Sequence, residues 1–384
     1  MSENNLIIAG AGSGKTTYLV KEAISRPDLN ILITTYTLSN EAAIKQELIR
    51  RNKCIPSNIT IQTWFSFLLQ HGVRPYQGAL DDSLFSECIG GMLLVNRSSG
   101  LKYTTSRGRP VYYAEDKECR MHYFTEDGRI YSDKLSKFVV KCNEKSSNAV
   151  LDRICRIYDY VMIDEVQDLA GYDLEIVKLL MKSSSSVLLV GDPRQVVYLT
   201  HHSRKHEKYR NGGIKDFVEG IDCRGIACKI DEVALKKSHR NNRAICEYSS
   251  RLYPHFVSTD PCLCCRESKW KHEGIFLVKA NDVELYTQEY DVIQLRMSVK
   301  TDVRPGIMVK SFGESKGLTF DRVLLYPTED MTRWIEDNKS RLMDSTRARF
   351  YVALTRAKHS VGIVMDYEEG RRYDGVEKYR PECP

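Results

Sequence analysis

The part of this chain with the clearest potential for chemistry is LIIAGAGSGKTT, residues 6–17. Its three glycines stand at alternate positions, and glycines let a backbone fold around a phosphate with its N–H groups turned inward. Lys15 would reach the β- and γ-phosphates of a nucleotide, and the Thr16 hydroxyl would hold Mg²⁺. An ordinary glycine-rich turn is the alternative, but a strand, Gly-Lys-Thr and a helix in this order favour a nucleotide site.

These residues need a strand before the loop and a helix after it. The apolar run at residues 6–8 predicts a buried parallel strand, and a helix beginning near Lys15 would add the partial positive charge of its N-terminus. The strict nucleotide-loop pattern has glycine where this chain has Ala9. We assign the binding of ATP to the residues of this loop, which are Ala9, Gly10, Ala11, Gly12, Ser13, Gly14, Lys15, Thr16 and Thr17.

A second acidic motif follows an apolar run later in the chain. The sequence YVMID ends at Asp164, and Glu165 comes next. A carboxylate at the end of such a strand is placed to hold Mg²⁺, so Thr16 and Asp164 are the candidate metal ligands. Glu165 can orient and deprotonate an attacking water. Taken alone, the acidic pair fits a helix N-terminus better, but the phosphate loop favours catalysis.

Composition limits the class of protein. The 384 residues are 42% hydrophobic and 28% charged, which predicts a soluble globular protein of two or three domains without a membrane span. The formal net charge of +6 permits a nucleic-acid partner. Twelve cysteines beside a nucleotide loop predict reduced thiols and a cytoplasmic protein. The cluster Cys262, Cys264 and Cys265 could hold zinc, but its spacing favours ordinary thiols.

The chain is expected to be α/β. We place a first lobe at residues 1–73 and 151–229, and a less periodic insertion of short helices and a hairpin at 74–150. A second lobe follows at 230–369, and 370–384 is expected to be a frayed tail. We expect strands at residues 6–8, 30–35, 58–62, 160–164, 187–190, 275–278, 306–310, 322–326 and 361–365. We expect one helix that is capped by Ser39 and runs to about residue 51, and two more at 64–70 and 172–182.

Together these motifs resemble a superfamily 1 helicase of the UvrD/Rep type. AGAGSGKT is similar to the family's first motif, alanine included, and DEVQD to its second. Further motifs follow in family order. The resemblance implies two RecA-like P-loop NTPase lobes with ATP between them, a small inserted subdomain in the first lobe, and a motor on single-stranded or partly duplex DNA.

The resemblance also implies which residues contact DNA. Tyr36 stands where the family has an aromatic side chain that stacks on a base, although it could equally be a core tyrosine. Thr63 and Trp64 resemble the next DNA-contacting motif, with the same alternative for the aromatic side chain. Tyr209 and Arg210 look like a displaced version of a further motif, after the basic loop that begins at His201. That loop suits a phosphate backbone or is simply solvated.

The remaining motifs imply residues around the γ-phosphate and the base. Gln195, in GDPRQ, would sense the γ-phosphate, and Arg240 would meet it from the second lobe. Arg356, in YVALTRAK, matches the arginine finger. His239 replaces a tyrosine that stacks on adenine, and Gly317 belongs to the fifth motif.

The implied function is ATP-dependent translocation on, or unwinding of, DNA in the 3′–5′ direction. The chain departs from the family pattern in two ways. The adenine-reading glutamine motif is absent before Ala9, which predicts weak selectivity between ATP and GTP. Only about sixty residues separate Arg243 from Ile307. The family's regulatory insertion is therefore expected to be missing. The alternative is a DNA-sensing regulatory ATPase that switches a partner nuclease in antiviral defence or DNA repair, since no nuclease residues stand out here.

Overall fold

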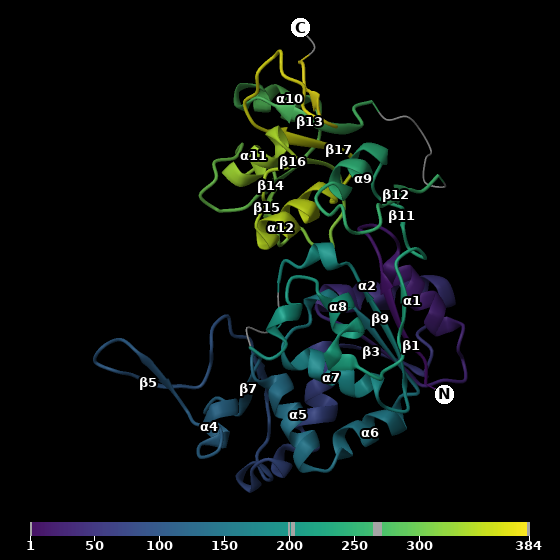
Figure 1. Cartoon of the computed structure of the whole chain (residues 1–384), viewed down its shortest axis with the longest axis vertical. Coiled ribbons are helices and arrows are strands. Elements are labelled where there is room, and N and C mark those ends of the chain that lie inside the picture. Colours follow the sequence, from purple (N-terminus) through teal and green to yellow (C-terminus); the bar gives the residue numbers. More distant parts are fainter. Residues whose placement is uncertain (1, 199, 201–203, 264–270, 382–384) are drawn as a thin grey trace. The chain divides into compact units, whose positions relative to one another are not determined.

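The computed structural model describes residues 2–198, 200, 204–263 and 271–381 (Figure 1). It divides into two compact units. Unit 1 comprises Met1–Ile7, Thr16–Gly191 and Leu199–Ile230, and unit 2 comprises Ile8–Lys15, Asp192–Tyr198 and Asp231–Pro384. Residues 8–15 of the phosphate loop and residues 192–195 of the GDPRQ segment therefore belong to the same unit as the C-terminal part of the chain. The domain limits drawn from the sequence stay a prediction.

Unit 1 is built on a six-stranded sheet of order β10-β1-β9-β8-β2-β3. The pairs β2/β3, β2/β8 and β8/β9 are parallel. Every residue of β2 and β8 is buried, as expected of parallel strands covered on both faces. The strands are β1 (Asn4–Ile8), β2 (Ile31–Thr35), β3 (Ile59–Thr63), β8 (Tyr160–Asp164), β9 (Ser186–Gly191) and β10 (Lys229–Asp231); the helices are α1 (Lys15–Ile24), α2 (Leu38–Asn52), α3 (Trp64–Leu68), α7 (Tyr172–Met181) and α8 (Ile214–Glu219).

The inserted segment of unit 1 consists of short elements, including a hairpin as expected. Its strands β5 and β6 are antiparallel, and β4 and β7 are parallel. Tyr123 and Phe124 pack edge-on against Phe138, with ring centroids 5.0 and 5.3 Å apart. The elements are β4 (Gly91–Leu93), β5 (Leu101–Thr104), β6 (Pro110–Tyr112), α4 (Cys119–Tyr123), β7 (Arg129–Tyr131), α5 (Leu135–Lys145) and α6 (Ala149–Ile157).

Unit 2 has its own six-stranded sheet, of order β15-β14-β16-β17-β13-β18, in which all pairs are parallel. The α/β class is thus confirmed, with one sheet in each unit as two RecA-like lobes require. The strands are β13 (Gly274–Val278), β14 (Ile293–Arg296), β15 (Val309–Ser311), β16 (Phe320–Tyr326), β17 (Ala357–Val364) and β18 (Glu377–Lys378); β11 (Lys237–Ser238) and β12 (Asp260–Pro261) form a separate pair; the helices are α9 (Arg243–Ser250), α10 (Val283–Glu289), α11 (Glu329–Glu336) and α12 (Asp344–Leu354).

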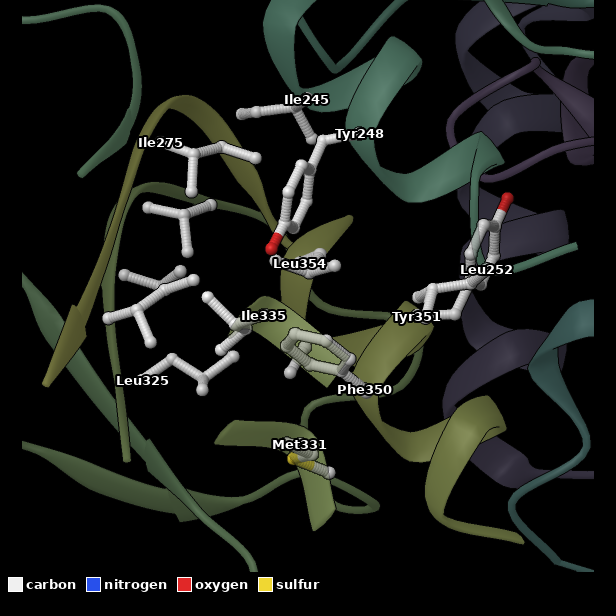
Figure 2. Packing of buried hydrophobic residues seen from close by; sticks show 14 of the residues in the cluster. Ile245, Tyr248, Leu252, Ile275, Leu325, Met331, Ile335, Phe350, Tyr351 and Leu354 are labelled. Atoms are coloured by element: carbon white, nitrogen blue, oxygen red, sulfur yellow. The ribbon is translucent and has the colours of Figure 1, made fainter. Parts of the chain in front are cut away.

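The largest core of unit 2 lies between this sheet and the helices α9, α11 and α12. Figure 2 shows Tyr248 of α9 and Phe350 of α12 beside the sheet residues Ile275 and Leu325, all of them at most 2% exposed. Burying an aromatic or aliphatic side chain of this size contributes about 1.5–3 kcal/mol. This packing fixes α12, and α12 carries Tyr351 and leads directly into Arg356.

Two expectations about elements were wrong, and one strand of the unit 2 sheet was not expected. The tail is not frayed through its length, because β18 pairs with β13 and both Tyr373 and Tyr379 are buried. The N-cap of α2 is Thr37, whose hydroxyl accepts the Asn40 N–H at 3.1 Å, and Ser39 lies inside the helix. Strand β14 was missed.

Two further observations concern membranes and metals. In the described part of the chain, no helix is long and apolar enough to span a bilayer. No group of three or more His, Cys, Asp or Glu side chains that could hold a metal occurs among the described residues either. Cys262 is buried, whereas Cys264 and Cys265 lie outside the described residues, as does His201 of the basic loop.

A buried histidine makes the stability of unit 1 dependent on pH. His71 is 2% exposed, and its ring nitrogens lie 2.9 Å from Arg153 Nη1 and 3.2 Å from the Tyr158 hydroxyl. Burial, and then the charge of Arg153, lower the pKa of His71 from 6.5 to about 4. The folded state therefore favours the neutral ring. The stability that depends on this neutral ring is fully present above pH 6.5 and is lost as the pH falls toward 4.

We expect acidification from pH 7.5 to 5 to cost the wild-type protein roughly 2 kcal/mol through His71. A His71→Gln variant keeps a polar side chain but does not titrate, so it should lose less stability over the same interval. Urea unfolding of both proteins at the two pH values measures the difference. Equal pH dependence in the two proteins would contradict the assignment.

Candidate active site

The phosphate loop connects β1 to α1 and is held in a tight curve. Gly12 and Gly14 have φ of +70° and +85°, a backbone region that glycine adopts without strain. Ser13 is 3% exposed, and its hydroxyl has no hydrogen-bond partner among the described residues. A buried polar atom without a partner usually marks a missing ligand or water. The loop therefore fits a phosphate group, with Lys15 at the first position of α1.

The loop backbone is hydrogen-bonded to the segment after β11, within unit 2. The Ser238 hydroxyl donates to the Ala11 carbonyl at 3.0 Å, and the His239 N–H donates to the Gly12 carbonyl at 2.8 Å. A Cβ on Gly12 would lie 2.7 Å from both Ser238 Oγ and Arg240 Cβ. Only glycine allows this approach, so Gly12 serves the packing of the loop as well as its curvature. The His239 side chain is exposed.

A polar network connects the loop with the predicted arginine finger. The Ala11 N–H donates to the Tyr351 hydroxyl at 3.3 Å, and that hydroxyl lies 3.4 Å from Asp192 Oδ2. Gln195 Nε2 donates to the same carboxylate oxygen at 2.7 Å, and Gln195 Oε1 accepts from Arg356 Nη2 at 3.0 Å. A chain of hydrogen bonds through three side chains, those of Tyr351, Asp192 and Gln195, thus connects a backbone amide of the phosphate loop to the Arg356 guanidinium.

The guanidinium of Arg356 is buried, at 1% exposure. It also donates to the carbonyls of Val352, at 2.9 Å, and Leu318, at 3.3 Å. Leu318 follows Gly317, whose φ of +83° closes the turn that brings this carbonyl to the arginine. The Arg240 guanidinium donates to the Thr355 carbonyl at 3.2 Å. Arg240, Gly317 and Arg356, which lie far apart in the sequence, therefore meet around the end of α12.

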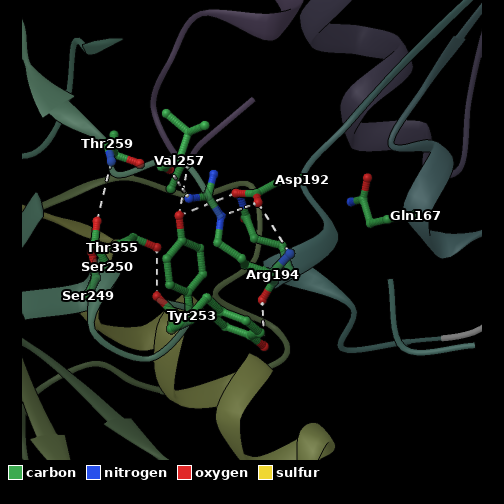
Figure 3. A network of polar contacts seen from close by, with 12 residues as sticks. Gln167, Asp192, Arg194, Ser249, Ser250, Tyr253, Val257, Thr259 and Thr355 are labelled. Atoms are coloured by element: carbon green, nitrogen blue, oxygen red, sulfur yellow. Dashed lines mark hydrogen bonds and ion pairs between the residues drawn. The ribbon is translucent and has the colours of Figure 1, made fainter. Parts of the chain in front are cut away.

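Arg194 was not predicted from the sequence, yet it fixes the carboxylate of this network. Its Nε donates to Asp192 Oδ1 at 2.7 Å and its Nη1 to the Val257 carbonyl at 3.3 Å (Figure 3). The guanidinium also lies over the Tyr351 ring at 5.3 Å. Burial alone would lower the pKa of Arg194, but the Asp192 charge outweighs it and holds the pKa above its usual value. Both side chains of the pair are almost completely buried.

We expect an Arg194→Met variant to lose about 3–5 kcal/mol of unfolding free energy, because it leaves the Asp192 carboxylate buried without its partner. The double variant Asp192→Asn/Arg194→Met should recover part of that loss. Urea unfolding of both single variants and the double variant gives the coupling energy. The exposed Arg224→Met substitution is the matched control. A loss no larger than that of the control would contradict the pairing.

Unit 1 carries the acidic motif at the end of β8. Asp164 is 5% exposed and pairs in the ladder with Val190, next to Gly191. Glu165 has φ of +53°, a left-handed conformation that is uncommon for residues other than glycine and occurs often at functional sites. The Gln167 amide donates to the Glu165 carboxylate, so a neighbouring side chain orients it. In the sequence, Gln167 was recognisable only as part of the DEVQD motif, without a role of its own.

The predicted DNA-contacting residues differ in exposure. Tyr36 is half-buried, edge-on to Phe65 at 5.6 Å. Thr63 caps α3 through the Ser66 N–H at 3.2 Å. Trp64 is a core side chain, 1% exposed, whose Nε1 donates to Asp173 at 2.7 Å.

The third predicted DNA motif, Tyr209 and Arg210, lies in the described part of the chain. Tyr209 is 7% exposed, and its hydroxyl donates to Asp222 at 2.6 Å. Arg210 pairs with Glu207 at 2.8 Å. Trp64 and Tyr209 are thus buried among the described residues, and their contact with DNA stays a prediction.

Comparison with known proteins finds similarity to DNA helicases. Residues 112–206 match the model of the UvrD/REP helicase N-terminal domain. A probable DNA helicase of Mycoplasma pneumoniae is 23% identical over 432 residues, which cover 94% of this chain and 80% of that protein. A probable DNA helicase II homolog of Mycoplasma capricolum is 35% identical over 54 residues, or 14% of this chain and 8% of that protein. The chain is therefore similar to UvrD/Rep-like helicases, clearly over residues 112–206 and more distantly over most of its length.

Solved structures similar to this UvrD/Rep-like chain include the arterivirus nonstructural protein 10 helicase, at 16% identity and a TM-score of 0.43. The match covers 95% of this chain and 60% of that one. Its complex with DNA gives 15% identity and a TM-score of 0.44, with 95% and 61% covered. The chain thus spans about three-fifths of the length of these proteins.

Proposed function

We propose that this UvrD/Rep-like chain hydrolyses ATP and uses the reaction to move along DNA and separate its strands in the 3′–5′ direction. The observation that carries the proposal is the network from Ala11 through Tyr351, Asp192 and Gln195 to Arg356. It joins the predicted phosphate-binding loop to the predicted arginine finger in one polar assembly. The relatives named as DNA helicases support DNA as the substrate. The direction rests on the resemblance of the motifs.

The proposed chemistry is in-line attack of water on the γ-phosphate. Lys15 and the loop N–H groups would bind the β- and γ-phosphates, while His239 and Gly317 would lie near the base and ribose. Glu165, oriented by Gln167, would accept the proton of the water. The oxygen atoms of Thr16 and Asp164 are ligands of the kind that Mg²⁺ prefers, and the ion would neutralise phosphate charge when bound.

Arg356, Arg240 and Gln195 would stabilise the charge that develops in the transition state. Arg356 donates to the uncharged oxygens of Gln195, Val352 and Leu318. A γ-phosphate is a stronger acceptor than these oxygens, because it is negatively charged and can accept two parallel N–H bonds from one guanidinium. Binding of ATP would therefore draw Arg356 and Gln195 from their present partners, and release of phosphate would return them.

This exchange also suggests how the reaction would produce movement. The Ala11 N–H that donates to Tyr351 is one of the amides that a bound phosphate would claim. The phosphate and the Tyr351 hydroxyl would compete for it, so the nucleotide state would set the contacts of α12. Such an alternation between two sets of contacts is what a ligand-driven switch requires. Tyr36 and Thr63 would hold single-stranded DNA, with Tyr36 stacked on a base.

A strand-displacement assay tests this function. Duplexes with a 3′ or a 5′ single-stranded overhang are incubated with the isolated chain and ATP. The proposal predicts displacement from the 3′-overhang substrate. The alternative from the sequence, a DNA-sensing regulatory ATPase that serves a partner nuclease in antiviral defence, predicts DNA-stimulated ATP hydrolysis without displacement. Displacement from the 5′-overhang substrate alone would contradict the direction.

A further inference from the structure

The hairpin of β5 and β6 forms an arm to which the proposed motor function assigns no role. Figure 1 shows β5 in a loop that extends away from α5 and α6 of the same unit. The Thr105 N–H donates to the Arg109 carbonyl at 2.9 Å, and the Gly108 N–H to the Thr105 carbonyl at 2.9 Å. Gly108 has φ of +74° with open space around it. This tight turn holds Arg107 at the tip of the hairpin.

The base of the hairpin is anchored firmly. The Ser99 hydroxyl donates to Asp133 at 2.5 Å, and Lys134 donates to the carbonyls of Ser99, at 3.0 Å, and His122, at 2.6 Å. Burial lowers the pKa of Lys134 to about 8. The Tyr113 N–H donates to the Gly100 carbonyl at 2.9 Å. The arm is thus fixed at its base and exposed beyond it.

Most of the hairpin surface is exposed in the part of the chain that the structure describes. All four residues of β5 are exposed, and the exposed fractions of Leu101, Tyr103 and Tyr112 are 51%, 55% and 41%. A two-stranded hairpin without a buried face is marginally stable by itself. Large exposed apolar side chains gathered on such an element usually mark a surface that binds a partner.

The charges of the hairpin indicate the kind of partner. Residues 96–114 contain four cationic side chains and no Asp or Glu; the four are Arg97, Lys102, Arg107 and Arg109. Lys102 pairs with Glu118, whereas the other three make no ion pair in the part of the chain that the structure describes. Cations that alternate with exposed tyrosines suit a phosphate backbone with unpaired bases. The core of a protein interface is, in contrast, depleted of charge.

We propose that the hairpin at residues 101–112 binds single-stranded DNA, with Arg107 and Arg109 on phosphates and Tyr103 and Tyr112 stacked on bases. The inference deepens the proposed function, on which it rests, by adding a DNA contact in the inserted segment. The match to the family model begins only at residue 112, so the assignment comes from the hairpin's own residues. Stacking on tyrosine tolerates any base, which suits a protein that moves along DNA.

The test measures binding of a fluorescein-labelled thymidine oligonucleotide by fluorescence anisotropy at several salt concentrations, without nucleotide. Arg107→Gln/Arg109→Gln should reduce the slope of log K against log salt by about 1.4, because each single-strand phosphate contact contributes about 0.7. Tyr103→Ser/Tyr112→Ser should weaken binding by roughly 30-fold or more, because two stacking contacts are lost, and should leave the slope unchanged. All these side chains are exposed, and thermal unfolding of each variant checks that the fold is kept.

The matched controls lie in the same inserted segment. Lys117→Gln/Lys145→Gln removes two exposed charges, and Phe85→Ser removes a ring that is 84% exposed. Both controls should bind as the wild type does. If the wild type binds DNA and the hairpin variants bind equally well with the same slope, the hairpin has another partner and the inference is overturned. If the wild type itself fails to bind DNA, the proposed function fails.

Discussion

An Arg356→Ala variant is expected to lose ATP turnover by about 10³–10⁵-fold while it keeps most of its affinity for the nucleotide. Most ground-state contacts with the phosphates would come from Lys15 and the loop backbone. The guanidinium would act mainly on charge that appears in the transition state, and a group of that kind changes kcat more than binding.

Steady-state turnover at saturating ATP, measured beside titration with a fluorescent ATP analogue, gives the two quantities separately. Because Arg356 is buried, Arg356→Lys is the second variant; it keeps the charge but not the paired donors, and it should also be slow. Arg341→Ala, at an exposed position, is the matched control. Weak binding with normal turnover at saturation would reverse the role assigned to Arg356.

A Glu165→Gln variant is expected to bind ATP with wild-type affinity and to lose about 10²–10⁴-fold in turnover. Glutamine fills the same volume, and its carbonyl oxygen can still accept from the Gln167 amide, but it does not take a proton from water. The left-handed backbone of residue 165 is kept, so the chemistry of the side chain is the only large change.

The same binding and turnover assays test Glu165. Glu219→Gln, an exposed carboxylate of unit 1, removes one charge away from the motif and should leave both quantities unchanged. Hydrolysis by Glu165→Gln at the wild-type rate would show that another group accepts the proton.

Local patterns allowed much of the fold to be predicted from the sequence. The apolar runs within β2, β8 and β16 are flanked by polar residues, so their approximate positions follow from the local pattern. Strand β14 was missed because Ile293–Arg296 has only two apolar residues, and its neighbours in the sheet decide its conformation. β18 was missed for the same reason: two residues pair only because β13 lies beside them.

The candidate site was predictable in its motifs but not in its connections. Glu165, Gln195 and Arg356 stand in recognisable sequences, whereas the hydrogen bond between Gln195 and Arg356 joins positions 161 residues apart. Arg194 reads as an ordinary basic residue in a motif, and only its burial beside Asp192 distinguishes it. The sequence predicted a hairpin in the inserted segment but not its exposure. Exposure depends on whether other parts of the chain pack against the hairpin, and a short stretch of sequence does not determine that.

The most direct measurement of the central claim is the rate of ATP hydrolysis by the isolated wild-type chain with and without single-stranded DNA. Our account predicts slow hydrolysis without DNA and a rate that rises with DNA concentration until it saturates. Both Arg356→Ala and Glu165→Gln should abolish the stimulated rate. A rate that is independent of DNA, or DNA-stimulated hydrolysis that survives both substitutions, would contradict the proposal of an ATP-driven DNA motor.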